Sequence, residues 1–133
     1  MKTIMQAGAI VFRFKNDRPY VLIVNAKKNP EHRIFPKGHL EEGETGEQAA
    51  RRELLEEAGV GGKVLRFIAE RSFEMNDSTY KVAYYLLRYD STEGAGEPGR
   101  NPSWYPVDEA LSMLSFPDTR ELLRSAAPYM IQY

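Results

Sequence analysis

The sequence predicts an α/β fold in which a mixed β-sheet packs between helices. Three observations support this prediction. β-rich runs lie on both sides of one strongly signalled central helix, a short polar break joins the first two runs, and two helical segments end the chain. The 133 residues, 42% of them hydrophobic, are enough for one domain with a real core and too few for two.

The first two predicted strands cover residues 9–14 and 20–25. The polar break "KNDRP" separates them, so they are expected to form a hairpin, which argues against a purely parallel sheet. A short apolar "IF" at 34–35 precedes "PKGHLEEGETGE", residues 36–47. That segment is too rich in glycine and charge for a core element, and we predict a long surface loop of the kind on which functional sites are built.

A helix is predicted over residues 46–58. Thr45 and Gln48 have the spacing of a capping box at its start, and Gly59 stands where a left-handed residue often ends a helix. The helical period gives it a buried line of Ala50, Leu54 and Ala58. This line would face the sheet and leave the acidic residues beside it.

Two further strands are predicted over residues 64–73 and 79–89, joined by the turn "EMNDS". The glycine-rich segment 90–102 is expected to be a flexible loop before a short strand at 103–107. A short helix over 108–114 would be capped by Asp108, and a final helix starting at Pro117 would be interrupted by Pro128.

Charge and composition exclude several classes of function. The 18 basic and 19 acidic residues nearly cancel, so no positive field recruits nucleic acid or a membrane surface. The absence of cysteine excludes disulfides, thiolate nucleophiles and cysteine metal ligands. No apolar run approaches the ~20 residues of a membrane helix, and the N-terminal apolar stretch has the pattern of a strand, so a cytoplasmic location is expected.

The predicted central helix carries a crowded acidic face. Glu53, Glu56 and Glu57 emerge from nearly one side, where two carboxylates about 4 Å apart repel by roughly 4 kcal/mol at an effective dielectric of ~20. A solvated face would explain these residues alone. The preceding loop adds several glycines and three more acidic residues, Glu41, Glu42 and Glu44. Mg²⁺ prefers oxygen ligands and usually keeps several waters and substrate phosphates in its coordination sphere. These carboxylates therefore suit a partly open Mg²⁺ site.

From Gly38 to Val60 the sequence reads "GHLEEGETGEQAARRELLEEAGV". This matches Gx5Ex7REUxEExGU, where U is aliphatic, and so resembles the complete sequence box of the Nudix hydrolase family. The flanking elements are also similar, so the resemblance implies one Nudix-type α/β/α sandwich over residues 1–133. It further implies hydrolysis of nucleoside diphosphates linked to another group, or of related pyrophosphates, with Mg²⁺ or Mn²⁺.

The resemblance assigns roles within the box. Metal ligands would be Glu53, Glu56, Glu57 and the carbonyl oxygen of Gly38. Glu44 and Arg52 would form an ion pair that fixes the loop against the helix. One of the glutamates, or a carboxylate on a later loop, would orient or deprotonate the attacking water. A further metal-binding glutamate often lies ahead of an aromatic residue such as Trp104, and Glu97 is our first choice for it, with Glu93 second.

The entrance "PKGH" at 36–39 resembles that of dinucleoside polyphosphate and diphosphoinositol polyphosphate hydrolases. By that resemblance Lys37 and His39 would face phosphates. Arg33 and Lys81 would add positive charge, and Tyr80 would stack on a base, although surface charges and a core aromatic are the alternatives.

Several functions follow from the resemblance. The first is Mg²⁺-dependent hydrolysis of a dinucleoside polyphosphate such as diadenosine tetraphosphate. The second is a nucleoside triphosphate pyrophosphohydrolase of the MutT kind, and the third, hydrolysis of capped RNA ends, is disfavoured by the lack of excess basic charge. A non-catalytic nucleotide sensor is the alternative outside enzymes. The partner would be a small nucleotide or polyphosphate, and the chain would be a monomer or a homodimer.

Overall fold

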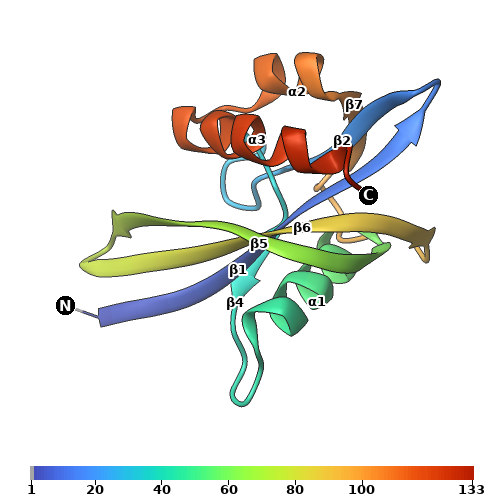
Figure 1. Ribbon diagram of the computed structural model, residues 1–133. Coiled ribbons are helices and arrows are strands. Elements are labelled where there is room, and N and C mark those ends of the chain that lie inside the picture. Colours follow the sequence, from blue (N-terminus) through green and yellow to red (C-terminus); the bar gives the residue numbers. More distant parts are fainter. Residues whose placement is uncertain (1) are drawn as a thin grey trace.

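The computed structural model describes residues 2–133 and confirms an α/β/α sandwich with a mixed sheet. Helix α1 covers one face of the sheet, and α2 and α3 cover the other (Figure 1). The helices are α1 (Gly46–Ala58), α2 (Val107–Met113) and α3 (Pro117–Met130). The strands are β1 (Lys2–Lys15), β2 (Arg18–Asn25), β3 (Arg33–Ile34), β4 (Lys37–His39), β5 (Val60–Met75), β6 (Ser78–Thr92) and β7 (Ser103–Pro106).

The seven-stranded sheet is organised around β1. Its main path runs β3-β2-β1-β6-β5, with β7 added beside β2 and β4 beside β1. β1 pairs parallel with β6 along Lys2 to Phe12, whereas its pairings with β2 and β4 are antiparallel. β1 therefore lies at the centre of the sheet, between β6 on one side and β2 and β4 on the other.

Both long hairpins turn at an Asn-Asp pair. Asn16 and Asp17 have φ angles of 52° and 60°, and Asn76 and Asp77 have 53° and 62°. Two consecutive positive φ values match the twist of a tight antiparallel hairpin, and Asn and Asp tolerate them better than most residues. The polar breaks predicted from the sequence are therefore the two hairpin turns.

Helix α1 begins and ends as predicted. Thr45 Oγ1 accepts a hydrogen bond from the Gln48 backbone N–H at 3.2 Å, and the Gln48 side chain accepts one from the Thr45 N–H at 3.0 Å. Gly59 ends the helix with φ 69°. The buried line of Ala50, Leu54 and Ala58 packs against the sheet, with Ala49 beside it. This packing fixes the direction in which the acidic face points.

Three expectations about local structure were wrong. Residues 37–39 are not loop but β4, because their backbone pairs with Gln6–Gly8 of β1. Asp108 does not cap α2, since Pro106 holds that position and Asp108 lies in the first turn. Pro128 does not interrupt α3, which continues to Met130. No helix within residues 2–133 has the length and apolar character needed to cross a membrane.

Candidate active site

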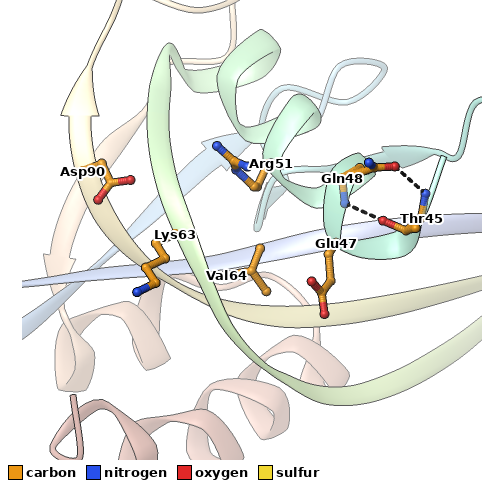
Figure 2. A pocket seen from close by; sticks show the side chains of 7 residues that line it. All are labelled: Thr45, Glu47, Gln48, Arg51, Lys63, Val64 and Asp90. Carbon is orange, nitrogen blue, oxygen red and sulfur yellow. Dashed lines mark hydrogen bonds between the residues drawn. The ribbon is translucent and has the colours of Figure 1, made fainter.

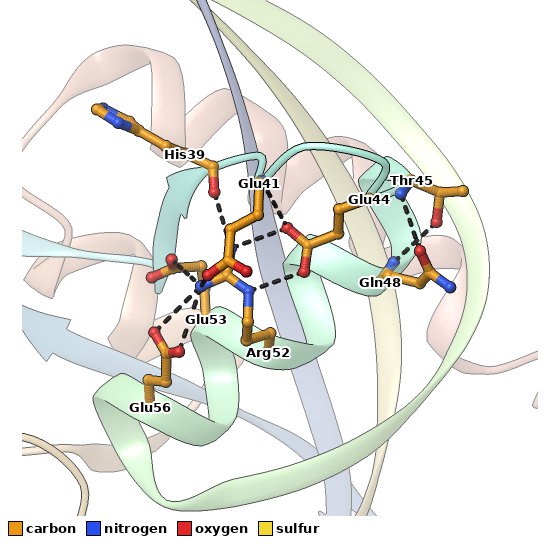
Figure 3. Close-up of polar contacts among 8 residues, drawn as sticks. All are labelled: His39, Glu41, Glu44, Thr45, Gln48, Arg52, Glu53 and Glu56. Atoms are coloured by element: carbon orange, nitrogen blue, oxygen red, sulfur yellow. Dashed lines mark hydrogen bonds and ion pairs between the residues drawn. The ribbon is translucent and has the colours of Figure 1, made fainter.

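Arg52 is the centre of an ion-pair network between α1 and the loop before it (Figure 3). Its Nε and Nη2 donate to the two oxygens of Glu44 at 2.8 and 2.9 Å, so the ion pair expected from the sequence is present. Nη1 contacts Glu53 at 2.8 Å and Glu56 at 3.2 Å. Nη2 also donates to the carbonyl of His39 at 2.8 Å. The Arg52 guanidinium thus contacts β4, the loop and the helix at the same time.

Glu44 is held in its charged form by this network. The side-chain hydrogen bonds from Arg52, and then the backbone N–H of Glu41 at 2.9 Å, lower the pKa of Glu44 to about 2. The same contacts raise the pKa of Arg52 above its usual range. The pair therefore stays ionised at any ordinary pH and keeps the loop closed on the helix.

Gly38 lies directly against the carboxylate of Glu53. A Cβ atom placed on Gly38 would overlap the Glu53 carboxyl carbon and both of its oxygens. Only glycine leaves room here for the β4 backbone and the acidic side chain to approach each other. The arrangement places a main-chain segment and a carboxylate side by side.

Glu57 is a buried carboxylate with an incomplete set of partners. It is 1% exposed, and neither of its oxygens accepts a hydrogen bond within residues 2–133. The nearest cation is Arg100, whose Nη1 lies 3.5 Å from Glu57 Oε1. Burial and then the adjacent Glu53 raise the pKa of Glu57 to about 9, against the opposing effect of Arg100. The ionised form of such a buried carboxylate would be stabilised by another cation nearby.

Arg100 also fixes the loop that follows β6. Its Nε donates to Glu97 Oε1 at 2.7 Å and its Nη1 donates to the carbonyl of Asn25 at 3.1 Å. Gly96 lies against the backbone of Glu57 and Ala58, and the Glu97 N–H donates to the Glu57 carbonyl at 3.1 Å. Glu97 is therefore brought to the edge of the site through Arg100, whereas Glu93 contacts Ser91 Oγ.

The acidic residues can supply ligands to a divalent cation, but they do not form a complete set of ligands around one point. Within the described chain, no three carboxylate or imidazole groups are gathered closely enough to make a metal site. Glu56 and Glu53 point to Arg52, and Glu57 points to Arg100. The oxygens of Glu57 that lack hydrogen-bond donors, and the glycine cradle against Glu53, are the two features that suit a hard cation.

Lys37 links the carboxylates to a large pocket. Burial lowers its pKa, while the charges of Glu57 and Glu53 act in the opposite direction. Its Nζ lies 3.4 Å from Gln6 Oε1 and 5.2 Å from the centre of the Phe73 ring. The pocket has a volume of about 700 Å³ and lies between the sheet and the start of α3. Lys37 is one of its lining residues, so the pocket opens beside the acidic cluster.

The other expected substrate contacts divide into two groups. His39 and Tyr80 lie near each other, with ring centres 6.1 Å apart, and Tyr80 stacks on Phe73 at 4.9 Å. Arg33 instead reaches Tyr105 Oη, at 3.4 Å. Lys81 follows Tyr80 on β6, so strand alternation directs it to the sheet face covered by α1. The structure therefore places His39 and Tyr80 near Lys37, and it separates Arg33 and Lys81 from them.

A second hollow of about 450 Å³ lies between the first half of α1 and strands β5 and β6 (Figure 2). It is lined by Thr45, Glu47, Gln48, Arg51, Lys63, Val64 and Asp90. None of these is a residue of the acidic cluster, and the charges of both signs are mixed. We assign it no role.

Sequence reasoning missed three residues of this region. Arg100 carries no sequence signal for a role here, because its contact with Glu57 depends on how the loop after β6 folds back. Tyr84 lies on β6 and lines the pocket, and nothing in the sequence indicated a pocket beside it. Asp118 lines the same pocket, and its position there depends on tertiary packing that no local pattern indicates.

Comparison with known proteins agrees with this geometry. The NUDIX domain model matches residues 3–126. An 8-oxo-(d)GTP phosphatase of Mycolicibacterium smegmatis is 31% identical over an alignment that covers 92% of this chain and 41% of that protein. Diphosphoinositol polyphosphate phosphohydrolase 2 of Rattus norvegicus is 32% identical over 82% of this chain and 62% of that protein. The chain thus spans about half the length of these curated relatives.

Among solved structures, a C. elegans Ap4A hydrolase in a binary complex superposes with a TM-score of 0.82. It is 24% identical and the match covers 98% of this chain and 99% of that one, so it supports the fold. The solution structure of the E. coli ORF135 protein gives a TM-score of 0.76 at 23% identity, covering 99% and 94% of the two chains. The family model matches nearly the whole chain, and the chain therefore belongs to the Nudix hydrolase family.

Proposed function

We propose that this protein is a Mg²⁺-dependent pyrophosphohydrolase, with Mn²⁺ as an alternative cation, that cleaves a phosphoanhydride bond by attack of water on phosphorus. The observation that carries the proposal is Glu57, buried with its oxygens unsatisfied and adjacent to Glu53 and Lys37. The cation's ligands would be Glu53, Glu56, Glu57, Glu97 and the carbonyl of Gly38. A bound divalent cation would neutralise the phosphates and polarise the attacked phosphorus.

The residues of the chain then have separate tasks in the reaction. Lys37 binds a phosphate oxygen, and the Arg52–Glu44 pair keeps Glu53 oriented from the helix side. The water oxygen bonds to phosphorus, the bridging P–O bond breaks, and a carboxylate of the cluster accepts the proton of the water. Positioning and electrostatics supply most of the rate enhancement in reactions of this type.

The preferred substrate is a dinucleoside polyphosphate such as diadenosine tetraphosphate. The "PKGH" entrance supports it, with Lys37 on the boundary between the carboxylates and the pocket. His39 and Tyr80 would extend the surface along which the phosphates and the second nucleoside lie. Arg33 and Lys81 would then act only through their longer-range electrostatic field, because Arg33 reaches Tyr105 and strand alternation directs Lys81 to the other face of the sheet.

A nucleoside triphosphate is the second candidate, and one observation favours it. The pocket beside Lys37, with a volume of about 700 Å³, is large enough for one nucleoside. A relative named for 8-oxo-(d)GTP supports the same class, while the relatives named for diphosphoinositol polyphosphates support a third. A small-molecule substrate in the cytoplasm is common to all three.

The products distinguish the candidates. The purified protein is incubated with Mg²⁺ and either diadenosine tetraphosphate or a nucleoside triphosphate, and the products are separated by anion exchange. ATP and AMP in comparable amounts would establish asymmetric cleavage of the dinucleotide. Monophosphate plus pyrophosphate from the triphosphate alone would assign the second candidate. Absence of cleavage of any of these and of a diphosphoinositol polyphosphate would contradict the proposed hydrolase.

A further inference from the structure

Arg100 is a buried arginine in a segment that forms no helix or strand. It lies in residues 93–102, between β6 and β7, and is only 9% exposed. Arginine is rarely buried to this extent unless its charge is paired. The groups that pair with Arg100 therefore indicate what it does at this place.

The Arg100 guanidinium contacts three parts of the chain at once. Its Nε donates to Glu97 Oε1 in the same loop at 2.7 Å, and its Nη1 donates to the Asn25 carbonyl at the end of β2 at 3.1 Å. Nη1 also lies 3.5 Å from Oε1 of Glu57 on α1. A planar guanidinium makes contacts in several fixed directions, whereas a lysine ammonium is a single point charge on a flexible stem.

Backbone hydrogen bonds hold the main chain of Arg100 beside the acidic cluster. The Arg100 carbonyl accepts from the Asn25 N–H at 2.7 Å, and Asn25 Nδ2 donates to the Gly99 carbonyl at 3.2 Å. On the other side, the Glu97 N–H donates to the Glu57 carbonyl at 3.1 Å. The loop is thus anchored both to β2 and to α1, with the Arg100 side chain between the two anchors.

The Glu97 side chain depends on Arg100 for its orientation. It is 36% exposed, and Arg100 Nε is the only hydrogen-bond donor to its carboxylate within residues 2–133. A glutamate on a loop loses side-chain entropy when it is fixed in one rotamer, so it needs a partner to stay there. Glu93, the other acidic residue of this loop, contacts Ser91 Oγ instead. Arg100 therefore directs Glu97, and not Glu93, to the acidic cluster.

Building on the proposed function, we infer that Arg100 is a positioning residue that sets the affinity of the site for a divalent cation. It holds the Glu97 carboxylate beside Glu57, so that the loop and the helix present their ligands together. Its contacts are to Oε1 of each carboxylate, which leaves Oε2 of each for the cation. Residues that orient metal ligands through hydrogen bonds act on affinity in this way.

Two roles for Arg100 predict opposite changes in cation affinity. A positive charge beside the site repels a cation, so removal of Arg100 would tighten cation binding if the residue contributed its charge alone. Removal should instead weaken binding if Arg100 orients the ligands, since partners of this kind contribute about 10- to 100-fold to metal affinity. The direction of the change therefore separates the two roles.

Mn²⁺ binding by the full chain without substrate tests the inference. Free Mn²⁺ is followed by electron paramagnetic resonance while the unaltered protein, Arg100→Lys and Arg100→Met are titrated. We expect the Kd to rise about 10-fold or more in Arg100→Lys, which keeps the charge and loses the planar fork, and to rise in Arg100→Met as well. Arg124→Lys makes the same change at an exposed position on α3 and should keep the Kd.

Glu97→Gln shows whether Arg100 acts through this carboxylate. It leaves Arg100 in place, so it remains informative if an Arg100 variant does not fold. We expect it to raise the Kd for Mn²⁺ by a similar factor. Adding Arg100→Lys to it should weaken binding by less than about 3-fold more, because both changes remove the same ligand. A merely structural role would lower the thermal midpoint without this coupling.

Several results would overturn the inference. These are unchanged or tighter Mn²⁺ binding in either Arg100 variant, an unchanged Kd in Glu97→Gln, or a double variant whose loss equals the product of the single losses. Each of them would leave the proposed hydrolysis standing. Absence of Mn²⁺ binding by the unaltered protein would instead contradict the cation site on which both proposals rest.

Discussion

The carboxylate of Glu53 lies directly against the α-carbon of Gly38, with no room for a methyl group between them. Gly38→Ala should therefore displace Glu53 or β4 and lower kcat/KM by about 100-fold, the scale of losing one well-placed electrostatic group. Gly94→Ala is the matched control, because a Cβ there meets nothing within 4 Å. Steady-state kinetics of both variants, with circular dichroism to verify folding, check this expectation. Equal activity in the two variants would contradict the close approach.

Arg52 should not be replaceable by lysine. Lysine keeps the positive charge but lacks the planar fork that reaches Glu44 through two nitrogens and the His39 carbonyl as well. We expect Arg52→Lys to lose about 10- to 100-fold in kcat/KM, as is usual for residues that orient metal ligands. Its thermal midpoint should fall too. Arg51→Lys, at the neighbouring exposed position, should change neither quantity, and an active Arg52→Lys would show that the fork is dispensable.

Glu57 gives the metal-free protein a specific pH dependence. Its pKa is raised from 4.5 to about 9 in the folded state. Between these pH values the folded protein holds a proton that the unfolded chain has released, so the free energy of unfolding falls as pH rises. Denaturant unfolding in EDTA at pH 6 and pH 8.5 measures the decrease. Glu57→Gln should remove most of it, and the same slope in both proteins would show that Glu57 is not its source.

A divalent cation should change that pH dependence in a predictable direction. Binding to Glu57 requires the ionised carboxylate, so cation binding releases a proton at neutral pH. Stabilisation by Mg²⁺ should therefore be larger at pH 8.5 than at pH 6. Thermal unfolding with and without Mg²⁺ at the two pH values measures this, and equal stabilisation at both would argue against binding at Glu57.

The loop that carries Glu97 should depend on Gly96 through its contact with α1. A Cβ on Gly96 would overlap the Glu57 carbonyl, and φ is 77°. Gly99 has a similar φ of 85° but open space around it, so Gly99→Ala carries only the backbone strain of ~1–2 kcal/mol. Gly96→Ala should destabilise the protein by more than this in denaturant unfolding. Equal effects of the two substitutions would mean that the loop does not depend on this contact.

Local signals in the sequence were sufficient for much of this structure. The capping box of Thr45 and Gln48 and the left-handed Gly59 placed both ends of α1, and the Asn-Asp pairs placed two hairpin turns. Each of these features depends on interactions among residues that are close in the sequence, so the sequence alone is enough to predict it.

Features that depend on distant parts of the chain were not visible in this way. β4 is a strand only because β1 lies beside it, and glycine and charge in its sequence gave the opposite expectation. The Glu44–Arg52 pair came from the family motif, whereas the approach of Arg100 to Glu57 spans a long loop with no such motif. The pocket is assembled from β3 to β6 and α3 and has no local signature at all.

The central claim is that Glu57 and its neighbours hold a divalent cation for cleavage of a phosphoanhydride bond. Its most direct test compares the protein and Glu57→Gln, each with Mg²⁺ and with EDTA, on diadenosine tetraphosphate and a nucleoside triphosphate, with products resolved by anion exchange. We predict that the unaltered protein with Mg²⁺ cleaves at least one of the two substrates. Cleavage of that substrate should be at least about 100-fold slower by Glu57→Gln with Mg²⁺ and by either protein in EDTA. Comparable cleavage by Glu57→Gln, or by the unaltered protein in EDTA, would contradict the claim.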